Sequence, residues 1–162
     1  MGRMITLQHG NSTFTYRVAA VIIDQNRVLL HHAEQENCWS LPGGQVDFWE
    51  PAAQALRRVL REEMGAEVAI DRLLWVVENF STHQGGRRHE LGLYFLVHLP
   101  LTAGQLRDAS VFEGQHPALT LIFRWFSIES SSLEALTLNP EFLRDSLLSL
   151  PDQVVHITGI HY

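Results

Sequence analysis

Long apolar runs, paired cysteines and an excess of positive charge are all missing from this chain, and each absence excludes a class of protein. No uninterrupted apolar stretch is long enough to cross a bilayer, so a membrane protein is not expected. The first four residues are not followed by the apolar segment that a secretory signal contains. The single cysteine, Cys38, cannot form an internal disulfide, which favours a reducing, cytoplasmic location.

Basic residues are fewer than acidic ones, with 12 Lys and Arg against 18 Asp and Glu and a formal net charge of −6. This balance argues against general binding to a nucleic-acid backbone, which needs a basic surface. A polyphosphate substrate would also be repelled by such a chain unless a cation held it. The charge therefore points to a metal ion if the ligand is a phosphate compound.

The chain also lacks repeats, low-complexity tracts and linkers, so a single domain over residues 1–162 is predicted. A hydrophobic content of 46% with 19% charged residues is typical of a globular domain with a buried core.

Runs of apolar and β-branched residues predict strands, and a turn at 24–26 joins two of them in a hairpin. The predicted strands are 4–7, 14–23, 27–32, 68–80, 91–99 and 119–126. The segments 39–44 and 81–90 are expected to be loops. Helices are predicted at 51–64, 132–136 and 140–150, whereas the tail after Pro151 carries no readable pattern. Hairpins with a few helices predict an α+β or mixed α/β fold rather than a regular βαβ array.

The helix at 51–64 carries two carboxylates on or near its apolar side. At 100° per residue, the apolar stripe consists of Ala52, Leu56, Val59 and Leu60. Glu63 falls inside this stripe and Glu62 lies at its edge. A carboxylate on the buried side of a helix is unfavourable unless it is paired or bound to a metal ion, and a divalent cation would satisfy both. Ordinary ion pairs with Arg58 or Arg61 are the alternative, which the helix alone slightly favours.

The residues around this helix carry a specific spacing. Residues 44–66 are GQVDFWEPAAQALRRVLREEMGA. They resemble the Nudix box, G-x5-E-x7-R-E-U-x-E-E-x-G-U with U apolar, at Gly44, Glu50, Arg58, Glu62, Glu63 and Gly65. The preceding Trp-Ser-Leu-Pro-Gly at 39–43 is the usual approach to that box. The chain is thus similar to the Nudix hydrolase superfamily (MutT-like), and outside the box the likeness continues in outline only.

The resemblance implies a Nudix fold, in which a mixed β-sheet is sandwiched between helices. It implies that Glu62 and Glu63 hold Mg²⁺ or Mn²⁺ and that Arg58 belongs to the catalytic set. Gly43 and Gly44 let the backbone approach a ligand closely, and Glu50 follows at a fixed distance before the helix, so these three residues are predicted to bind substrate. The expected reaction is the metal-dependent hydrolysis of a nucleoside diphosphate linked to another group, X.

Phe48 and Trp49 flank the metal-binding loop in this interpretation. They are candidates for stacking on a base or for closing over the site. Local packing is an equally good interpretation of both.

One position departs from the box, because Val59 stands where the pattern has glutamate. General-base assistance is typically worth about 100- to 10,000-fold, so its loss would leave a slow enzyme. A base outside the box is the alternative. Glu113, placed in a loop before the strand at 119–126, is the first candidate and would also be a third metal ligand. Glu90 is the second candidate, and a solvated surface carboxylate is the competing interpretation for both.

Histidines are weaker candidates for the missing base. His83, His89 and His116 are more typical of loop or surface positions than of catalysts. The adjacent pair His31 and His32 lacks metal-ligand spacing and is interpreted as structural.

Two functions remain open at this stage. The first is a pyrophosphohydrolase whose partner is a small nucleotide or nucleoside-diphosphate derivative. The second is a catalytically weakened or inactive Nudix-fold protein that binds nucleotides or regulates. Retention of Glu50, Arg58, Glu62 and Glu63 favours the first. The substrate is not predicted, because specificity resides in variable loops, and a homodimer is left open.

Overall fold

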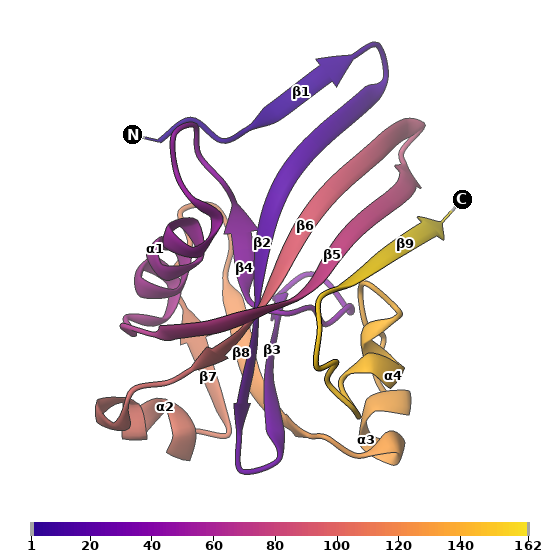
Figure 1. The fold of residues 1–162 in the computed structure, drawn as a ribbon. Helices are drawn as coiled ribbons and strands as arrows, with labels where there is room; N and C mark the ends of the chain where they lie inside the picture. Colours follow the sequence, from indigo (N-terminus) through magenta and orange to yellow (C-terminus); the bar gives the residue numbers. More distant parts are fainter. Residues whose placement is uncertain (1, 162) are drawn as a thin grey trace.

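The computed structural model describes residues 2–161, in which nine strands form one large mixed sheet. The strands are β1 Thr6–His9, β2 Ser12–Asp24, β3 Arg27–Ala33, β4 Gly43–Gln45, β5 Ala69–His83, β6 Gly86–His98, β7 Val111–Gly114, β8 Leu121–Ser127 and β9 Val155–His161. Their order is β7-β8-β3-β2-β6-β5-β9, and β1 and β4 also pair with β2 (Figure 1). The β2–β6 and β5–β9 pairs are parallel, whereas the β2–β3, β5–β6 and β3–β8 pairs are antiparallel.

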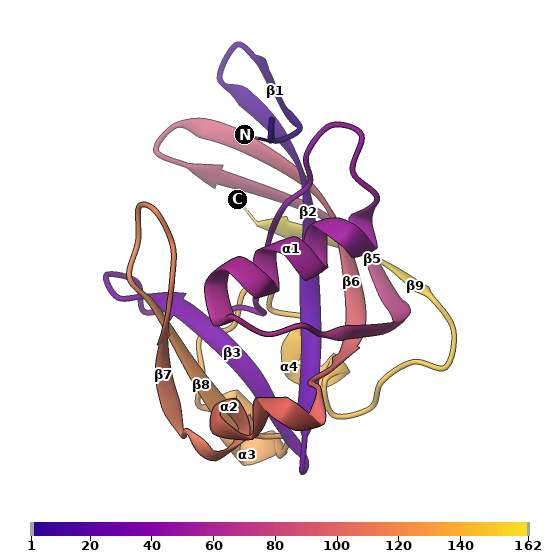
Figure 2. The ribbon, with the colours of Figure 1, turned by 90° about the vertical axis from the view of Figure 1, so that its left-hand side faces the viewer.

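Helices cover both faces of this sheet, as Figures 1 and 2 show. They are α1 Ala52–Met64, the 3-10 helix η1 Leu101–Ala103, α2 Gly104–Asp108, α3 Ser130–Glu134 and α4 Leu143–Ser146. Alternate residues of β2 point to opposite faces, so Val18 packs in the core beneath α1 and Ala19 in the core beneath α3 and α4. The predicted mixed sheet between helices is confirmed. None of the helices in residues 2–161 is both long and apolar enough to cross a membrane.

The strand β2 belongs to two diverging parts of the sheet. It pairs with β6 from Ser12 to Ile22 and with β4 at residues 17–19, whereas it meets β3 only at its last two residues, Ile23 and Asp24. The strands β3, β8 and β7 therefore swing away from β2, as Figure 2 shows. The opening between the two parts lies at the end of α1 that carries the glutamate pair.

Two tight turns explain one confirmed prediction and one wrong prediction. The predicted hairpin at 24–26 is confirmed, with Gln25 and Asn26 at φ 49° and 57°. The predicted loop at 81–90 is wrong, because β5 continues to His83 and β6 starts at Gly86. Gln84 and Gly85, at φ 48° and 78°, close this hairpin in two residues. Paired positive φ values match the twist of a hairpin, and the polar residues lie on its exposed strands.

The helix α1 is confirmed and ends as the sequence indicates. Gly65 takes a left-handed conformation at φ 68°, and its N–H donates to the Arg61 carbonyl at 2.9 Å. Pro51 occupies the N-cap position, one residue before the helix, instead of the first helical position predicted from the sequence.

Other bounds differ from the predictions. The first strand begins at Thr6 instead of residue 4, and the helix predicted at 132–136 is α3, Ser130–Glu134. The helix predicted at 140–150 shortens to α4. The tail after Pro151 forms β9 along the free edge of β5, with Trp75 opposite Val155. An edge strand of this kind is defined by its distant partner, which local patterning does not show.

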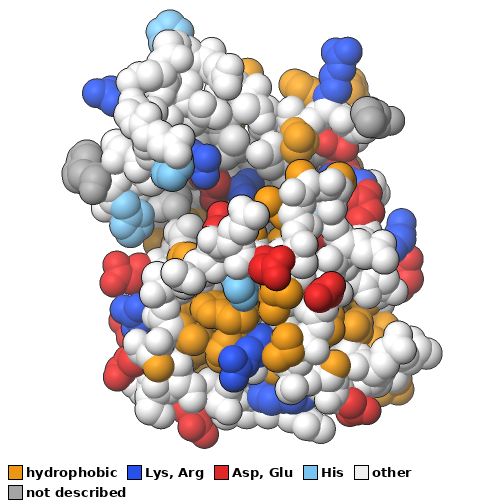
Figure 3. Space-filling view, turned by 180° about the vertical axis from the view of Figure 1, so that it is seen from behind, with side chains coloured by type: hydrophobic (Ala, Val, Ile, Leu, Met, Phe, Trp, Pro, Cys, Tyr) orange, Lys and Arg blue, Asp and Glu red, His pale blue; other side chains and the backbone are white. Residues whose placement is uncertain are grey.

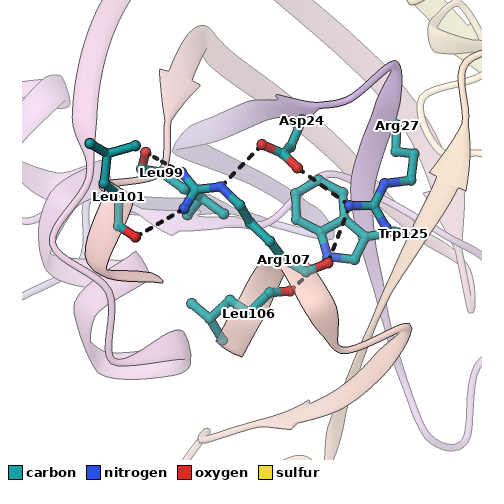
Figure 4. A network of polar contacts seen from close by, with 7 residues as sticks. All are labelled: Asp24, Arg27, Leu99, Leu101, Leu106, Arg107 and Trp125. Atoms are coloured by element: carbon teal, nitrogen blue, oxygen red, sulfur yellow. Dashed lines mark hydrogen bonds and ion pairs between the residues drawn. The ribbon is translucent and has the colours of Figure 1, made fainter. Parts of the chain in front are cut away.

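A polar network fixes the segment before β7 to the β2–β3 hairpin (Figure 4). The Asp24 carboxylate accepts hydrogen bonds from Arg27 at 3.3 Å and from Arg107 at 3.1 Å. Arg107 also donates to the Leu99 carbonyl at 2.7 Å, and the Arg27 guanidinium lies 5.0 Å from the Trp125 ring centroid. This network holds α2 and the start of β7 beside the core, and through them the loop that borders the site.

Candidate active site

A cavity of about 540 Å³ lies where the two parts of the sheet diverge, between α1, β4, β3 and the loop that joins β7 to β8. On the face seen in Figure 3, acidic, basic and histidine side chains gather around a hollow above a hydrophobic area. The cavity is lined in part by Arg17, His31, Gly43, Gly44, Arg58, Val59, Glu62, Glu63 and His116. The structure therefore brings most of the Nudix-box residues to one place.

Glu63 is the unusual carboxylate of this cavity. The residue is 9% exposed, and its Oε2 atom has no hydrogen-bond partner within residues 2–161. Burial raises the pKa of Glu63 to about 7, an effect that Arg17 opposes and Glu62 reinforces. The carboxylate thus lies in a position where a cation would stabilise its charged form.

Glu62 is more exposed and has a basic neighbour. Its side chain is 61% exposed, and its Oε2 lies 3.6 Å from Nη1 of Arg58. Arg61 instead pairs with Glu67. The alternative of ordinary ion pairs therefore applies to Glu62, whereas Glu63 forms no salt bridge in the described part of the chain.

Arg58 and Glu50 fasten the loop between β4 and α1 to the helix. Nε and Nη2 of Arg58 donate to the two carboxylate oxygens of Glu50 at 2.8 and 2.9 Å. Nη2 also donates to the Gln45 carbonyl at 3.1 Å, and Glu50 accepts from the Asp47 N–H at 3.1 Å. The bond to Arg58 holds the pKa of Glu50 below its usual value. In this geometry Glu50 faces Arg58 and not the cavity, so its first role is to position the loop.

Gly43 and Gly44 are required by close packing. A Cβ at Gly43 would lie 2.1 Å from the Val18 carbonyl oxygen, and one at Gly44 would lie 2.9 Å from Cγ2 of Val59. Larger residues would separate β4 from β2 or from α1. Because both glycines also line the cavity, this packing brings their backbone next to Glu62 and Glu63.

Val59 lines the same cavity and is 5% exposed. Its side chain fills the contact with Gly44 where the box pattern would place a third carboxylate. Within residues 2–161 no group of three or more His, Cys, Asp or Glu side chains is gathered closely enough to chelate a metal ion. The carboxylates available on α1 are therefore a pair.

The predicted set of Glu62, Glu63 and Glu113 is not assembled. Glu113 lies in β7 and not in a loop, and it is exposed. A Cβ on its neighbour Gly114 would meet Phe123 and the Glu63 carbonyl, so Gly114 faces α1. Because adjacent strand residues point to opposite sides, Glu113 points away from the cavity.

The other candidate bases occupy different places. Glu90 lies on β6, 3.7 Å from Nε of Arg17, and lines neighbouring cavities. His83 lies at the tip of the β5–β6 hairpin, and His89 stacks on Phe80 at 4.3 Å between ring centroids. Only His116 among these candidates lines the cavity that contains the glutamate pair.

Two further residues of the cavity are not indicated by motif spacing in the sequence. His31, which the sequence predicts to be structural, borders the site, and burial lowers its pKa to about 4, which keeps it neutral. Arg17 extends from β2 into the cavity. Its signal in the sequence is a single charge inserted in the apolar run Tyr16 to Ile23, which the box pattern does not cover.

Phe48 and Trp49 both have exposed side chains. They are 59% and 102% exposed, and Trp49 takes a φ of 60° in the loop before α1. Neither residue borders the cavity of Glu62 and Glu63.

A divalent cation fits the donors that this cavity presents. Glu62 and Glu63 offer hard oxygen ligands, and Oε2 of Glu63 is buried without a partner among the described residues. Magnesium is commonly bound by one or two carboxylates together with water and substrate phosphates, so a pair of carboxylates suffices.

The raised pKa of Glu63 predicts a distinct pH dependence. A carboxyl group that binds its proton more tightly when folded stabilises the folded state below its folded pKa, and this contribution is lost as the pH rises. With chelator present, the free energy of unfolding of the wild type relative to Glu63→Gln should fall between pH 4.5 and 7. The expected fall is about 3 kcal/mol, or less if the carboxyl is hydrated.

Urea denaturation of both proteins from pH 4 to 8 measures this difference. Excess Mg²⁺ should raise the free energy of unfolding of the wild type most strongly at the upper end of this pH range, because only the ionised carboxylate binds the cation. A difference that stays constant with pH would show that Glu63 titrates normally.

The comparisons with known proteins agree with this geometry. The NUDIX domain family model matches residues 13–145. Among solved structures, a MutT NUDIX hydrolase from Burkholderia pseudomallei is 24% identical with a TM-score of 0.61, over 84% of this chain and 98% of that one. A UDP-X diphosphatase is 17% identical with a TM-score of 0.59, over 88% of this chain and 66% of that one.

An ADP-ribose pyrophosphatase from Streptococcus suis 89-1591 is 17% identical with a TM-score of 0.57, over 88% of this chain and 97% of that one. At such identities these likenesses show the fold. No curated protein matches the chain. The family model, however, covers most of the sequence and includes the whole loop and helix of the site, and the chain therefore belongs to the Nudix family of phosphoric-anhydride hydrolases.

Proposed function

We propose that this protein is a divalent-metal-dependent pyrophosphohydrolase that cleaves a nucleoside diphosphate linked to a second group. The observation that carries the proposal is the buried carboxylate of Glu63, which opens onto a cavity beside Glu62 without a protein partner in the described chain. An apolar side chain at position 63 would be more stable in a protein that bound no cation there. The names of two structural neighbours, UDP-X diphosphatase and ADP-ribose pyrophosphatase, are consistent with such a substrate.

The residues of the cavity have different roles in this reaction. Glu62 and Glu63 would hold Mg²⁺ or Mn²⁺, which when bound screens the charge of the diphosphate and favours ionisation of water. Arg58 and Glu50 keep the loop and helix in register. A water oxygen bonds to one phosphorus, the anhydride P–O bond breaks, and the bridging oxygen leaves with the other phosphate. The proton released by the water passes to a base, and two phosphorylated products result.

A binding or regulatory role is the second candidate, and Val59 favours it. A buried apolar side chain occupies the position of a box carboxylate, which leaves the site with a carboxylate pair. Incubation with a panel of nucleotides and nucleotide sugars, with Mg²⁺ or Mn²⁺, separates the two functions when products are resolved by chromatography. Two phosphorylated products support the hydrolase, whereas tight binding without products in calorimetry supports the binding role.

We infer that His116 is the general base that compensates for Val59. It lines the cavity, and its Nδ1 accepts a hydrogen bond from the Ala118 N–H at 3.1 Å, so Nε2 carries the proton of the neutral ring in this geometry. To act as the base, His116 must release Ala118 and carry its proton on Nδ1, which frees the lone pair of Nε2 to accept the proton of a water molecule. We expect His116→Gln to lower kcat by about 100-fold or more with little change in KM. Glu113→Gln is the matched control, and it should change kcat less than about twofold because Glu113 points away from the cavity. A large fall in kcat for Glu113→Gln with none for His116→Gln would instead identify Glu113 as the general base.

Three expectations from the sequence stay proposals. They are a single domain over residues 1–162, a cytoplasmic location and a homodimer. Limited proteolysis tests the first, fractionation of the source cell tests the second, and light scattering coupled to size-exclusion chromatography tests the third.

A further inference from the structure

Arg17 lies between the metal-binding cavity and a second cavity of about 220 Å³. It is on β2, its side chain is 37% exposed, and its Nε atom lies 3.7 Å from Oε2 of Glu90 on β6. Arg17 and Ser40 are the described residues that border both cavities. A ligand that extended from one cavity into the other would therefore pass the Arg17 guanidinium.

The second cavity presents hydrogen-bonding groups of several kinds. Its wall contains the Glu90 carboxylate, the Asn79 amide, the Ser81 hydroxyl and the Arg88 guanidinium. Tyr94 also borders it but is 5% exposed, so it offers little ring surface for stacking. Carboxylate and amide oxygens accept hydrogen bonds, whereas amide and guanidinium nitrogens donate them. A group rich in hydroxyls, each of which both donates and accepts, matches this wall.

Asn79 brings an acceptor, unpartnered in the described chain, to the wall of the second cavity. Oδ1 of Asn79 is buried and has no hydrogen-bond partner within residues 2–161. Asn79 is paired with Gly159 of β9, where a Cβ would approach that oxygen to 2.9 Å. The glycine leaves the amide room, and a buried acceptor without a partner costs free energy until a donor satisfies it.

Arg17 is placed to exchange its ion pair with the Glu90 carboxylate for one with a phosphate. Its charge acts on Glu90 through the ion pair and on Glu63 in the metal-binding cavity. The chain contains no lysine, so all 12 of its cationic side chains are arginines. A planar guanidinium can donate two parallel hydrogen bonds to a phosphate, which bind more strongly than a pair at 3.7 Å. A diphosphate would therefore displace Glu90 from Arg17 and free the carboxylate to accept from a hydroxyl.

We propose that Arg17 binds the diphosphate of a nucleotide sugar and that the cavity of Glu90 and Asn79 holds the sugar. This inference rests on the proposed function and names its substrate class. The diphosphate would span the entrance to the metal-binding cavity, with the sugar hydroxyls hydrogen-bonded to Asn79 and Glu90. Arg17 is then a substrate-binding residue, and Glu90 is a specificity residue and not a base.

The test compares Arg17→Gln, Arg17→Lys and Arg61→Gln in steady-state hydrolysis and in calorimetric binding of a nucleotide sugar without metal. Arg61 is the matched control, because it is an exposed arginine paired with Glu67 outside both cavities. We expect Arg17→Gln to raise KM and Kd by roughly 10- to 100-fold, more than it lowers kcat, because charge-assisted bonds to phosphate are lost. Arg17→Lys should recover part of the affinity. Equal affinities for Arg17→Gln and Arg61→Gln would overturn the role of Arg17.

A second arm tests the sugar. Asn79→Ala and Glu90→Gln should raise KM for a nucleotide sugar relative to KM for a nucleoside triphosphate, since the latter has no sugar beyond its phosphates. The ratio of the two KM values is the measure, because Glu90→Gln also frees Arg17 for the phosphates of both substrates. Equal losses for both substrates would overturn the sugar assignment. If the wild type hydrolyses neither substrate, the proposed function fails while the calorimetric comparison still decides whether Arg17 binds the diphosphate. If it hydrolyses both and Arg17→Gln matches the wild type, this inference alone fails.

Discussion

Replacement of both Glu62 and Glu63 by glutamine is expected to lower turnover on the order of 10³-fold and to remove the stabilisation of the fold by Mg²⁺. A metal ion that polarises a phosphoryl group is worth several kcal/mol in the transition state, and each 1.4 kcal/mol is about tenfold in rate. The wild type should gain about 2.7 kcal/mol when Mg²⁺ is 100 times its dissociation constant. Glutamine keeps the shape of the side chain but carries no negative charge, so the double variant should gain nothing.

Thermal melts with Mg²⁺, with Mn²⁺ and with chelator measure this gain, and product assays measure the rate. Glu67→Gln is the matched control, because Glu67 is a carboxylate just beyond α1 that pairs with Arg61 and lies outside the cavity. It should retain both the rate and the metal response. A full metal response in the double variant would move the metal site elsewhere in the chain.

The single variant Glu63→Gln should show how far the buried carboxylate destabilises the fold. With chelator at pH 8, Glu63→Gln should be more stable than the wild type, because it removes a charge that is 9% exposed and unpartnered in the described structure. A destabilised position of this kind is common where function opposes stability. The gain should disappear when Mg²⁺ neutralises the wild-type carboxylate.

Local spacing was sufficient to predict the helix of the site and the side of the helix on which Glu62 and Glu63 lie. The positions of Glu62 and Glu63 follow from the periodicity of one helix, and its end at Gly65 follows from one backbone conformation. The hairpin at Gln25 and Asn26 was predictable for the same reason. In each case the residues that determine the geometry are neighbours in the sequence.

Other parts of the site depend on contacts between distant segments, which the sequence does not show. Glu113 and His116 lie within the same short stretch, yet only the strand pairing of β7 decides which of them faces the cavity. Arg17 borders the cavity because β2 pairs with β3 only at its last two residues, so the part of β2 that carries Arg17 is not covered by β3. The strand β9, which brings Gly159 beside Asn79, exists only because β5 has a free edge. These are properties of packing rather than of spacing.

Val59→Glu should strengthen metal binding while it weakens the metal-free fold. Position 59 borders the cavity one turn before Glu62 and Glu63, so a glutamate there adds a third carboxylate to the pair. Its methyl groups now fill the contact with Gly44, and a charge at a position that is 5% exposed would be unpaired without a cation. The expected loss with chelator is about 3–5 kcal/mol, and saturating Mg²⁺ should recover most of it.

Val59→Gln separates charge from shape in this experiment. It should lose about 1–3 kcal/mol from burial of an uncharged polar group, and Mg²⁺ should not recover that loss beyond the wild-type response. The pH–rate profiles then locate the base. If His116 supplies it, Val59→Glu should bind Mg²⁺ more tightly without a gain in kcat, and the limb of the profile should keep its position. A large gain in kcat would instead identify Val59 as the cause of a weakened enzyme and leave His116 without that role. If neither metal affinity nor turnover changes, position 59 does not face the metal, and the carboxylate pair must bind it from another side of the helix.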